Sequence, residues 1–180
     1  GLCHNMLSEK LKEGFWQREG DRSSAGKLWA IGYGNVGKEL VRLIQPFQCQ
    51  IRVRDIVDRS EFCRLFDAVE MELDELVAEA DIVTLHVPLT EDTENFINES
   101  VFAKMKASAF LVNTSRGRVV NQEDLHKALV SREIAGAGLD VFCEEPPKNI
   151  EFLQLSNLMV TSHIGGNAKE AVEAMGKAAI

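Results

Sequence analysis

From residue 27 onward, short apolar runs alternate with segments of helical periodicity. The predicted strands are 27–31, 50–54, 81–87, 109–113, 136–141 and 157–161, and the predicted helices are 35–45, 73–80, 100–106, 122–131 and a C-terminal segment. Runs such as 82–85 and 110–112 are almost continuously apolar, which is typical of strands covered by helices on both faces. The alternation predicts an α/β protein with a doubly wound parallel sheet, in which ligands gather beyond the carboxyl ends of the strands.

The two ends of the chain have a different pattern. Leu7, Leu11 and Phe15 recur every four residues and predict an amphipathic lead-in helix, which a polar connector follows. We therefore divide the chain into a lead-in helix and connector, 1–26, and one domain, 27–180. The chain begins with Gly1 and ends within a predicted helix, so we expect a piece of a longer protein.

Composition excludes several classes of protein. The 180 residues are 45% apolar, enough for one substantial core, and 20 Lys+Arg against 28 Asp+Glu give a net charge of -8. Without a basic run, neither nucleic acid nor an acidic membrane surface is an expected partner. No apolar stretch reaches the roughly 18 residues of a membrane span, and the N-terminus does not resemble a signal peptide. The four cysteines have no zinc-like spacing, so we expect reduced thiols, no metal and a cytoplasmic protein.

A glycine motif follows the first predicted strand. Gly32, Gly34 and Gly37 form the pattern GxGxxG at the start of a predicted helix. The first glycine permits a tight turn, the second lets the backbone approach a pyrophosphate, and the third lets helix and strand pack closely. The N-terminus of the helix offers unpaired N–H groups and the positive end of its dipole to phosphates. In the helix itself, the residues expected to face the core are Val36, Leu40, Val41 and Ile44.

An acidic residue strengthens the interpretation of this motif as a dinucleotide site. Asp55 ends the second strand, 18 residues after Gly37, close to the spacing of about 20 residues for a ribose-binding carboxylate. A carboxylate accepts hydrogen bonds from ribose hydroxyls and repels a 2′-phosphate. The sequence thus favours NAD over NADP, although Arg54 and Arg59 lie nearby.

Three later strands each end at residues that can do chemistry. Thr114, Ser115 and Arg116 follow one strand, Asp140 ends the next with Glu144 and Glu145 beyond it, and His163 follows the last, before Gly165 and Gly166. Reduction of a keto acid needs a cation for the substrate carboxylate and an acid for its oxygen, which arginine and histidine provide. A carboxylate beside the imidazole favours its charged form.

The motifs IGYGNVG, LHVPLTEDT, LVNTSRG, AGAGLDVFCEEP and TSHIGG, with Asp55, closely resemble the NAD-binding domain of the D-isomer-specific 2-hydroxyacid dehydrogenases over roughly residues 10 to 180. The resemblance implies a Rossmann fold without the family's substrate domain, and an NAD-dependent oxidoreductase that interconverts 2-keto and D-2-hydroxy acids. It also implies a homodimer.

The resemblance assigns roles to single residues. Arg116 would bind the substrate, His163 would be the acid and base, and Glu145, which precedes the proline, would be its partner rather than Glu144. Formate dehydrogenases of this superfamily have glutamine in place of Glu145. The implied cofactor-binding residues are Gly32, Gly34, Asn35, Val36, Gly37, Asp55, Val87, Pro88, Thr114, Ser115, Arg116, Asp140, His163, Gly165 and Gly166.

Two residues depart from the family pattern. Ser162 stands where proline usually precedes the histidine, which predicts a less rigid turn and a less certain direction for His163. Gln48 stands where glycine commonly ends the first helix, so that turn carries strain if it needs a positive φ.

Other functions and roles stay open at this point. An NAD(H)-sensing corepressor-like module of the same family could retain all three catalytic residues. An adenosylhomocysteine hydrolase is disfavoured by the motifs NTSRG and DVFCEEP. Among the remaining histidines, His4 and His126 are expected to be solvated, and His86 is expected to be structural rather than catalytic.

Overall fold

The computed structural model describes residues 27–32, 34–57 and 60–168. Its strands are β1 (Lys27–Ile31), β2 (Gln50–Arg54), β3 (Ala68–Glu70), β4 (Ile82–Leu85), β5 (Phe110–Asn113), β6 (Gly136–Leu139) and β7 (Leu158–Val160). Its helices are α2 (Asn35–Ile44), α3 (Ser60–Leu65), α4 (Leu73–Glu79), α5 (Glu99–Phe102), α6 (Gln122–Val130) and α7 (Ile150–Leu153), with 3-10 turns η1 (Gln45–Phe47) and η2 (Gly117–Val119). The predicted lead-in and C-terminal helices lie outside the described residues, and the division at residue 26 stays a prediction.

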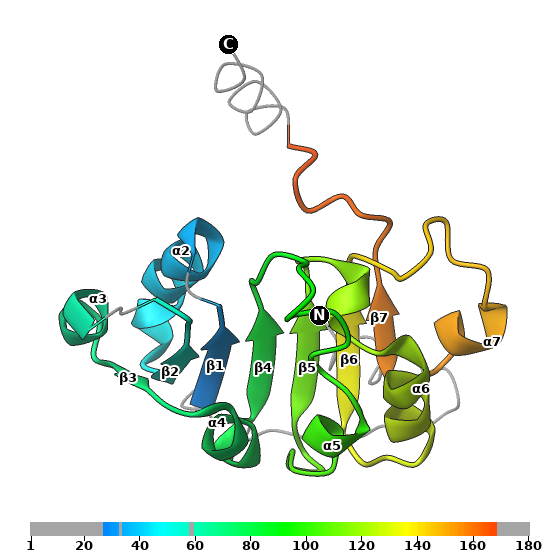
Figure 1. Ribbon diagram of the computed structural model, residues 1–180, viewed down its shortest axis with the longest axis horizontal. Coiled ribbons are helices and arrows are strands. Elements are labelled where there is room, and N and C mark those ends of the chain that lie inside the picture. Colours follow the sequence, from blue (N-terminus) through cyan, green and yellow to red (C-terminus); the bar gives the residue numbers. More distant parts are fainter. Residues whose placement is uncertain (1–26, 33, 58–59, 169–180) are drawn as a thin grey trace, which may run out of the picture.

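The seven strands form one parallel sheet in the order β3-β2-β1-β4-β5-β6-β7, with helices between successive strands (Figure 1). The order reverses between β1 and β4, because β2 and β3 extend the sheet on one side of β1 and β4 to β7 extend it on the other. This confirms the predicted doubly wound α/β fold. A crevice at such a reversal is where this fold binds ligands.

Two apolar clusters hold the layers together. The larger one joins β4, β5 and β6 to α4, α5 and α6, and includes the fully buried Leu85, Phe102 and Leu111. The smaller one joins β2 and β3 to α2 and α3 around Val41 and Val53. Each such side chain stabilises the fold by about 1.5–3 kcal/mol through removal from water.

Three of the six predicted strands end earlier than the apolar pattern predicts. β4 stops at Leu85, because its pairing with both neighbours stops there, opposite Ile31 of β1 and Asn113 of β5. β6 stops at Leu139 for the same reason. Residues 86–88 and 140–141 are consequently loop residues at the carboxyl edge of the sheet.

The sequence pattern did not predict three short elements. β3 has three residues, α3 six and α7 four, too few for a periodicity to show. The helix predicted at 100–106 is only α5, since the N–H groups of Lys104 and Met105 donate to carbonyls three residues back. That pattern belongs to 3-10 turns rather than to an α-helix.

Three residues test the burial and the backbone conformation that the sequence predicts. Val36 does not face the core, because its side chain is 64% exposed at the start of α2. Ile82 is 37% exposed, so the first residue of β4 is less covered than predicted. Gln48 has φ 54°, which confirms that this turn uses the left-handed region that glycine adopts more easily.

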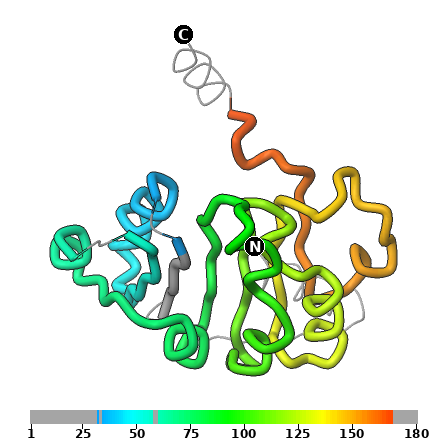
Figure 2. Tube along the Cα trace, viewed as in Figure 1, coloured from blue at the N-terminus to red at the C-terminus, as the bar shows by residue number. Residues whose placement is uncertain are grey.

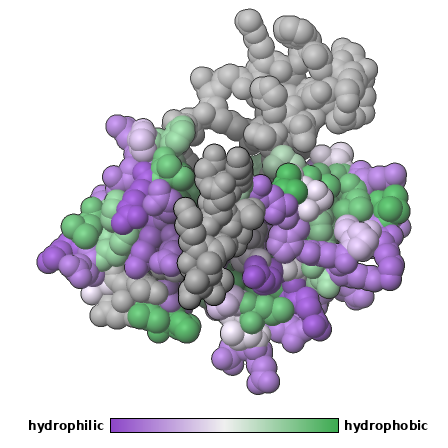
Figure 3. Space-filling view, turned by 90° about the horizontal axis from the view of Figure 1, so that it is seen from above, coloured by the Kyte–Doolittle hydropathy of each residue, from purple (hydrophilic) through white to green (hydrophobic). Residues whose placement is uncertain are grey.

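The carboxyl edge of the sheet carries the loops that follow β1, β4, β5, β6 and β7. After β7 the chain continues beyond this edge to residue 168 (Figure 2). Viewed from this side, the described surface mixes hydrophilic residues with separate apolar patches (Figure 3). Nowhere in residues 27–32, 34–57 and 60–168 is there a helix long and apolar enough to cross a membrane.

Candidate active site

A pocket of about 360 Å³ opens at the reversal of the strand order. It lies between the start of α2, the loop after β4 and the loop after β5. Its walls are Val36, His86, Val87, Pro88, Leu89, Thr114, Ser115 and Arg116. Six of these eight residues were predicted to bind a cofactor, and the pocket is where the fold predicts a ligand.

The glycine loop makes the tight turn that the motif predicts. Gly32 has φ 84°, and its N–H donates to the carbonyl oxygen of Arg54 at 2.8 Å. A Cβ at this position would lie 2.5 Å from Cγ1 of Val87 and 2.8 Å from the carbonyl carbon of His86. Only glycine therefore allows the loops after β1 and β4 to meet at the pocket.

The start of α2 suits a phosphate group. Gly34 is the N-cap, and no side chain among the described residues caps the helix. A Cβ on Gly34 would meet nothing within 4 Å, so the space beside it is open. Asn35 is exposed, and Gly37 is buried within α2. The open space and the uncapped N–H groups of this ten-residue helix fit a pyrophosphate.

Asp55 follows β2 at the same edge of the sheet. Its Oδ1 accepts a hydrogen bond from the N–H of Val57 at 3.2 Å, which fixes one carboxylate oxygen. The guanidinium of Arg54 donates to the carbonyl oxygen of Asp55 at 3.0 Å and pairs with Glu72 at 3.4 Å. Arg54 is thus engaged with its own neighbours, and Arg59 lies outside the described residues.

His86 lines the pocket but is held as a structural residue. Its Nε2 lies 3.1 Å from Oγ1 of the buried Thr84. Burial lowers the pKa of His86, because an imidazolium would lose its hydration there. The imidazole is therefore neutral at pH 7.

The loop after β5 is folded by Asn113, which is 1% exposed. Its Oδ1 accepts from the N–H and the hydroxyl of Ser115 at 3.0 and 2.9 Å, and its Nδ2 donates to the carbonyl oxygen of Arg116 at 3.0 Å. Arg116 itself is exposed, and its guanidinium donates to the carbonyl oxygen of Ser115 at 2.7 Å. Asn113 thus sets the backbone that presents Thr114 and Arg116 to the pocket.

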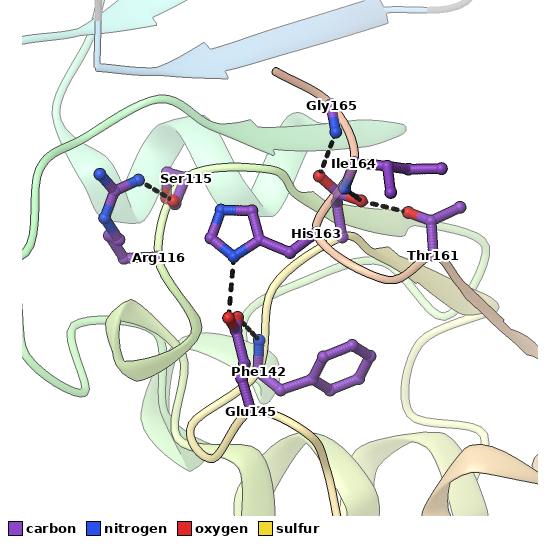
Figure 4. A network of polar contacts seen from close by, with 9 residues as sticks. Ser115, Arg116, Phe142, Glu145, Thr161, His163, Ile164 and Gly165 are labelled. Carbon is purple, nitrogen blue, oxygen red and sulfur yellow. Dashed lines mark hydrogen bonds and ion pairs between the residues drawn. The ribbon is translucent and has the colours of Figure 1, made fainter. Parts of the chain in front are cut away.

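His163 and Glu145 form the pair that the resemblance implies (Figure 4). Nδ1 of His163 lies 2.8 Å from Oε2 of Glu145, and Oε1 of Glu145 accepts from the N–H of Phe142 at 3.0 Å. The hydrogen bond with His163, followed by the one from Phe142, holds the pKa of Glu145 below its ordinary value. Glu144 pairs with Lys148, so the carboxylate that contacts His163 is that of Glu145.

His163 is aimed at Glu145 in spite of Ser162. The backbone of His163 has φ 56°, and the flanking Thr161 and Ile164 both bond to Asp140. The departure from proline at 162 therefore does not leave the imidazole out of line with Glu145.

Some of the predicted cofactor-binding residues line the pocket, and others lie outside it. Val36, Val87, Pro88 and Thr114–Arg116 line the pocket, whereas Gly165 and Gly166 are exposed on the segment after β7. Within the described part of the chain, no hydrogen bond joins Arg116 to Glu145 or His163. The structure therefore confirms the imidazole–carboxylate contact and brings Arg116 to the pocket by a separate loop.

Sequence reasoning missed two residues and misjudged a third. Asn113 and Thr161 were predicted only as the last residues of two strands. A polar residue at the end of an apolar strand was the signal that could have identified them as part of the site. His126 is part-buried, with its ring edge-on to Phe152 at 5.6 Å between centroids, so it is less solvated than predicted. His4 lies outside the described residues.

The remaining candidate groups are metal ligands and cysteines. Among the described residues, no three His, Cys, Asp or Glu side chains gather as a metal site would require. No disulfide joins the described cysteines, which are Cys49, Cys63 and Cys143.

Comparison with known proteins agrees with this geometry. The family model described as D-isomer specific 2-hydroxyacid dehydrogenase, NAD binding domain, matches residues 4–165. The chain belongs to this family. NAD is the cofactor of the family's domain, and the glycine turn, the uncapped α2 and the pocket fit it.

Relatives of the chain are longer than the chain itself. A hydroxypyruvate reductase of Thermotoga maritima is 37% identical over 172 residues, 92% of this chain and 55% of the relative. A glyoxylate reductase of Korarchaeum cryptofilum is 41% identical over 144 residues, 79% of this chain and 43% of the relative. A D-lactate dehydrogenase with NAD+ from Lactobacillus jensenii superposes with a TM-score of 0.88 at 26% identity, over 97% of this chain and 57% of that one. The chain spans about half the length of these relatives.

Proposed function

We propose that the protein, in its full length, interconverts 2-keto acids and D-2-hydroxy acids by hydride transfer with NAD. The observation that carries the proposal is the contact of 2.8 Å between Nδ1 of His163 and a Glu145 carboxylate whose other oxygen is also fixed. Such a pair leaves Nε2 of the imidazole to exchange a proton with a substrate. When bound, NAD accepts or supplies the hydride.

Each residue then has a defined task. His163 protonates the keto oxygen during reduction and takes the proton back during oxidation. Glu145 orients the ring through Nδ1 and stabilises its charged form. Arg116 binds the substrate carboxylate, since a guanidinium fork matches its two oxygens.

The cofactor site is proposed on the same basis. Its members are those implied by the sequence, from Gly32, Gly34, Asn35, Val36, Gly37 and Asp55 through Val87, Pro88, Thr114, Ser115 and Arg116 to Asp140, His163, Gly165 and Gly166. The pocket supports the six that line it, and Gly32 and Gly34 are supported by the turn and the open space at α2. A homodimer and a cytoplasmic location stay predictions of the resemblance and the composition.

The names of the relatives suggest which substrates to test first. Glyoxylate and hydroxypyruvate are named for two of them, and lactate, whose keto acid is pyruvate, for a third. All are small 2-keto or 2-hydroxy acids. The names are those of enzymes, which gives an NAD(H)-sensing corepressor no support.

The test is steady-state turnover of the full-length protein with NADH and these three keto acids. We expect His163→Ala to lower kcat by about 10²- to 10⁴-fold, the usual contribution of a general acid. His126→Ala, a histidine on α6 away from the pocket, is the control and should retain activity. Full activity in His163→Ala would refute the role of His163.

The 180-residue chain alone provides a second test. We expect it to bind NADH, measured by fluorescence titration, without efficient turnover. The chain covers about half of its relatives, and hydride transfer needs a site that closes around the substrate and excludes water. Efficient turnover by these residues would contradict this expectation.

A further inference from the structure

The carboxylate of Asp140 accepts hydrogen bonds from the segment that carries His163. The side chain is 6% exposed, directly after β6. Its Oδ1 accepts from the hydroxyl of Thr161 at 2.5 Å and from the N–H of Ile164 at 2.9 Å, and its Oδ2 accepts from the N–H of Gly165 at 2.9 Å. One buried carboxylate thus binds three donors within five consecutive residues, on both sides of His163 (Figure 4).

His163 lies at the centre of this segment in a conformation that needs support. Its φ of 56° is in the left-handed region, which is unfavourable for a residue with a side chain. The side chains of residues 161–168 are all exposed, so apolar packing does not hold the segment in place. Hydrogen bonds must do so. Three of these bonds go to Asp140. Within the described residues, one backbone hydrogen bond also connects 161–165 to the sheet, from the Thr161 N–H to the carbonyl oxygen of Leu139, at 2.9 Å.

The negative charge of Asp140 strengthens these bonds. Burial opposes ionisation, but the bonds from Thr161, Ile164 and Gly165 and the nearby His163 together hold the pKa of Asp140 below its ordinary value of 3.8. Asp140 is therefore an anion throughout the physiological range, and hydrogen bonds to an ionised acceptor are about twice as strong as neutral ones. Within the described part of the chain, the charged groups that face it are His163 and Glu145.

We propose that Asp140 and Thr161 are positioning residues for His163, which fold residues 161–165 into the one backbone conformation that directs the imidazole at Glu145. Glu145 then fixes the ring at Nδ1, while Asp140 and Thr161 fix the backbone from which the ring projects. Both carboxylates come from the single loop after β6, so this loop sets the position and the orientation of the histidine together.

This task is compatible with a contact between Asp140 and the cofactor. A carboxylate offers about four acceptor positions, and the segment fills three of them. One position on Oδ2 is left for a further donor. The inference rests on the proposed function, because the positioning matters for catalysis only if His163 transfers the proton.

The test compares Thr161→Val with Thr161→Ser in the full-length protein. Valine keeps the shape of threonine but removes the hydroxyl that bonds to Asp140, whereas serine keeps the hydroxyl. Ser162→Ala is the matched control, because it removes the neighbouring hydroxyl, which makes no hydrogen bond within the part of the chain that the structure describes. Thr161 is exposed, so all three variants should fold.

In kinetics, we expect Thr161→Val to lower kcat about tenfold while KM for the keto acid and Kd for NADH stay within about twofold. Thr161→Ser and Ser162→Ala should stay near the parent. Because Thr161 acts through the His163–Glu145 contact, Thr161→Val should add little to the loss caused by Glu145→Gln, as measured by a double-mutant cycle. Fully additive losses, or an unchanged kcat in Thr161→Val, would overturn the proposal.

A second readout does not depend on turnover. In protein labelled with ¹³C-histidine, the spectrum of His163→Ala identifies the His163 ring signal as the one that is lost. At constant pH we expect Thr161→Val and Asp140→Asn each to shift this ring signal, as Glu145→Gln does, while Ser162→Ala leaves it in place. An unshifted signal in both variants would refute positioning. If the parent protein has no activity but the signal shifts as expected, the proposed function fails and the positioning stands.

Discussion

Gly117 packs directly against the backbone of Phe142, so that a Cβ at position 117 would lie 1.9 Å from the Phe142 carbonyl carbon and 2.0 Å from its oxygen. This contact joins the loop of Arg116 to the loop of Glu145. It brings together two segments that come from neighbouring strands, β5 and β6, and it involves main-chain atoms that cannot rotate away.

We therefore expect Gly117→Ala to disturb both loops. One of them must move, which should destabilise the protein by about 1–3 kcal/mol, as overpacking does elsewhere, and should also lower kcat. Urea unfolding of the full-length protein measures the first effect, and turnover measures the second. Gly34→Ala is the control for stability, because its Cβ would meet nothing within 4 Å. Equal stability of Gly117→Ala and the parent would contradict the close packing.

Replacement of Glu145 should change the pH dependence of the reaction. The hydrogen bonds from His163 and Phe142 hold the pKa of Glu145 below its ordinary value of 4.5, so the carboxylate is ionised above about pH 4.5 and the pair is lost only as the pH falls through that lower pKa. Glutamine is neutral and stabilises the charged imidazole less. We expect Glu145→Gln to change the acidic limb of the kcat/KM profile for 2-hydroxy acid oxidation, with a loss of about 10- to 100-fold in kcat.

Glu144→Gln is the matched control for this experiment. It makes the same chemical change one residue earlier, in a side chain that pairs with Lys148 instead of His163. Its profile should coincide with that of the parent. If both variants had the same profile as the parent, the pairing of Glu145 with His163 would have no part in catalysis.

The sequence predicted those parts of the site that depend on strand ends. Arg116, Glu145 and His163 come after three successive predicted strands, and parallel strands place the residues at their carboxyl ends along one edge of the sheet. The turn at Gly32 and the positive φ of Gln48 were also accessible, because only local backbone geometry decides them.

The rest depended on contacts that sequence patterns do not record. The bonds of Asp140 to Thr161, Ile164 and Gly165 span 21 to 25 residues, and nothing in the spacing indicates which donors a strand-end aspartate will bind. The positive φ of His163, which lies between those bonds, was also not predicted. Likewise, β4 ends at Leu85 because its neighbours stop pairing there, although the apolar run continues to Val87.

His86 should make stability depend on pH. Its pKa is lowered in the folded protein from 6.5, so between pH 6.5 and the lower folded value the unfolded chain binds more protons. The free energy of unfolding therefore decreases as the pH falls through this window. We expect His86→Asn, which cannot titrate, to lose less stability than the parent between pH 7.5 and pH 5.5 in urea unfolding.

His126→Asn provides the comparison for this prediction, since it removes a different part-buried histidine and retains His86. Because His86 is retained, the decrease in stability that its protonation causes should remain. If His86→Asn and the parent lost equal stability over this range, the imidazole of His86 would not be held neutral by burial.

Asp55 should decide between NAD and NADP. Its carboxylate lies at the end of β2 with Oδ1 fixed by the N–H of Val57, and the neighbouring Arg54 is paired with Glu72. A 2′-phosphate would therefore meet the negative charge of Asp55, while Arg54 is engaged with Glu72, and like charges in contact cost several kcal/mol. We expect Asp55→Asn to weaken NAD+ binding and to raise the affinity for NADP+ relative to NAD+ by tenfold or more, which corresponds to about 1.4 kcal/mol. Fluorescence titration of the full-length protein with both nucleotides measures the ratio.

Glu70→Gln, which removes an exposed carboxylate from edge strand β3, should leave the ratio unchanged. A ratio in Asp55→Asn equal to that of the parent would show that the discrimination arises elsewhere.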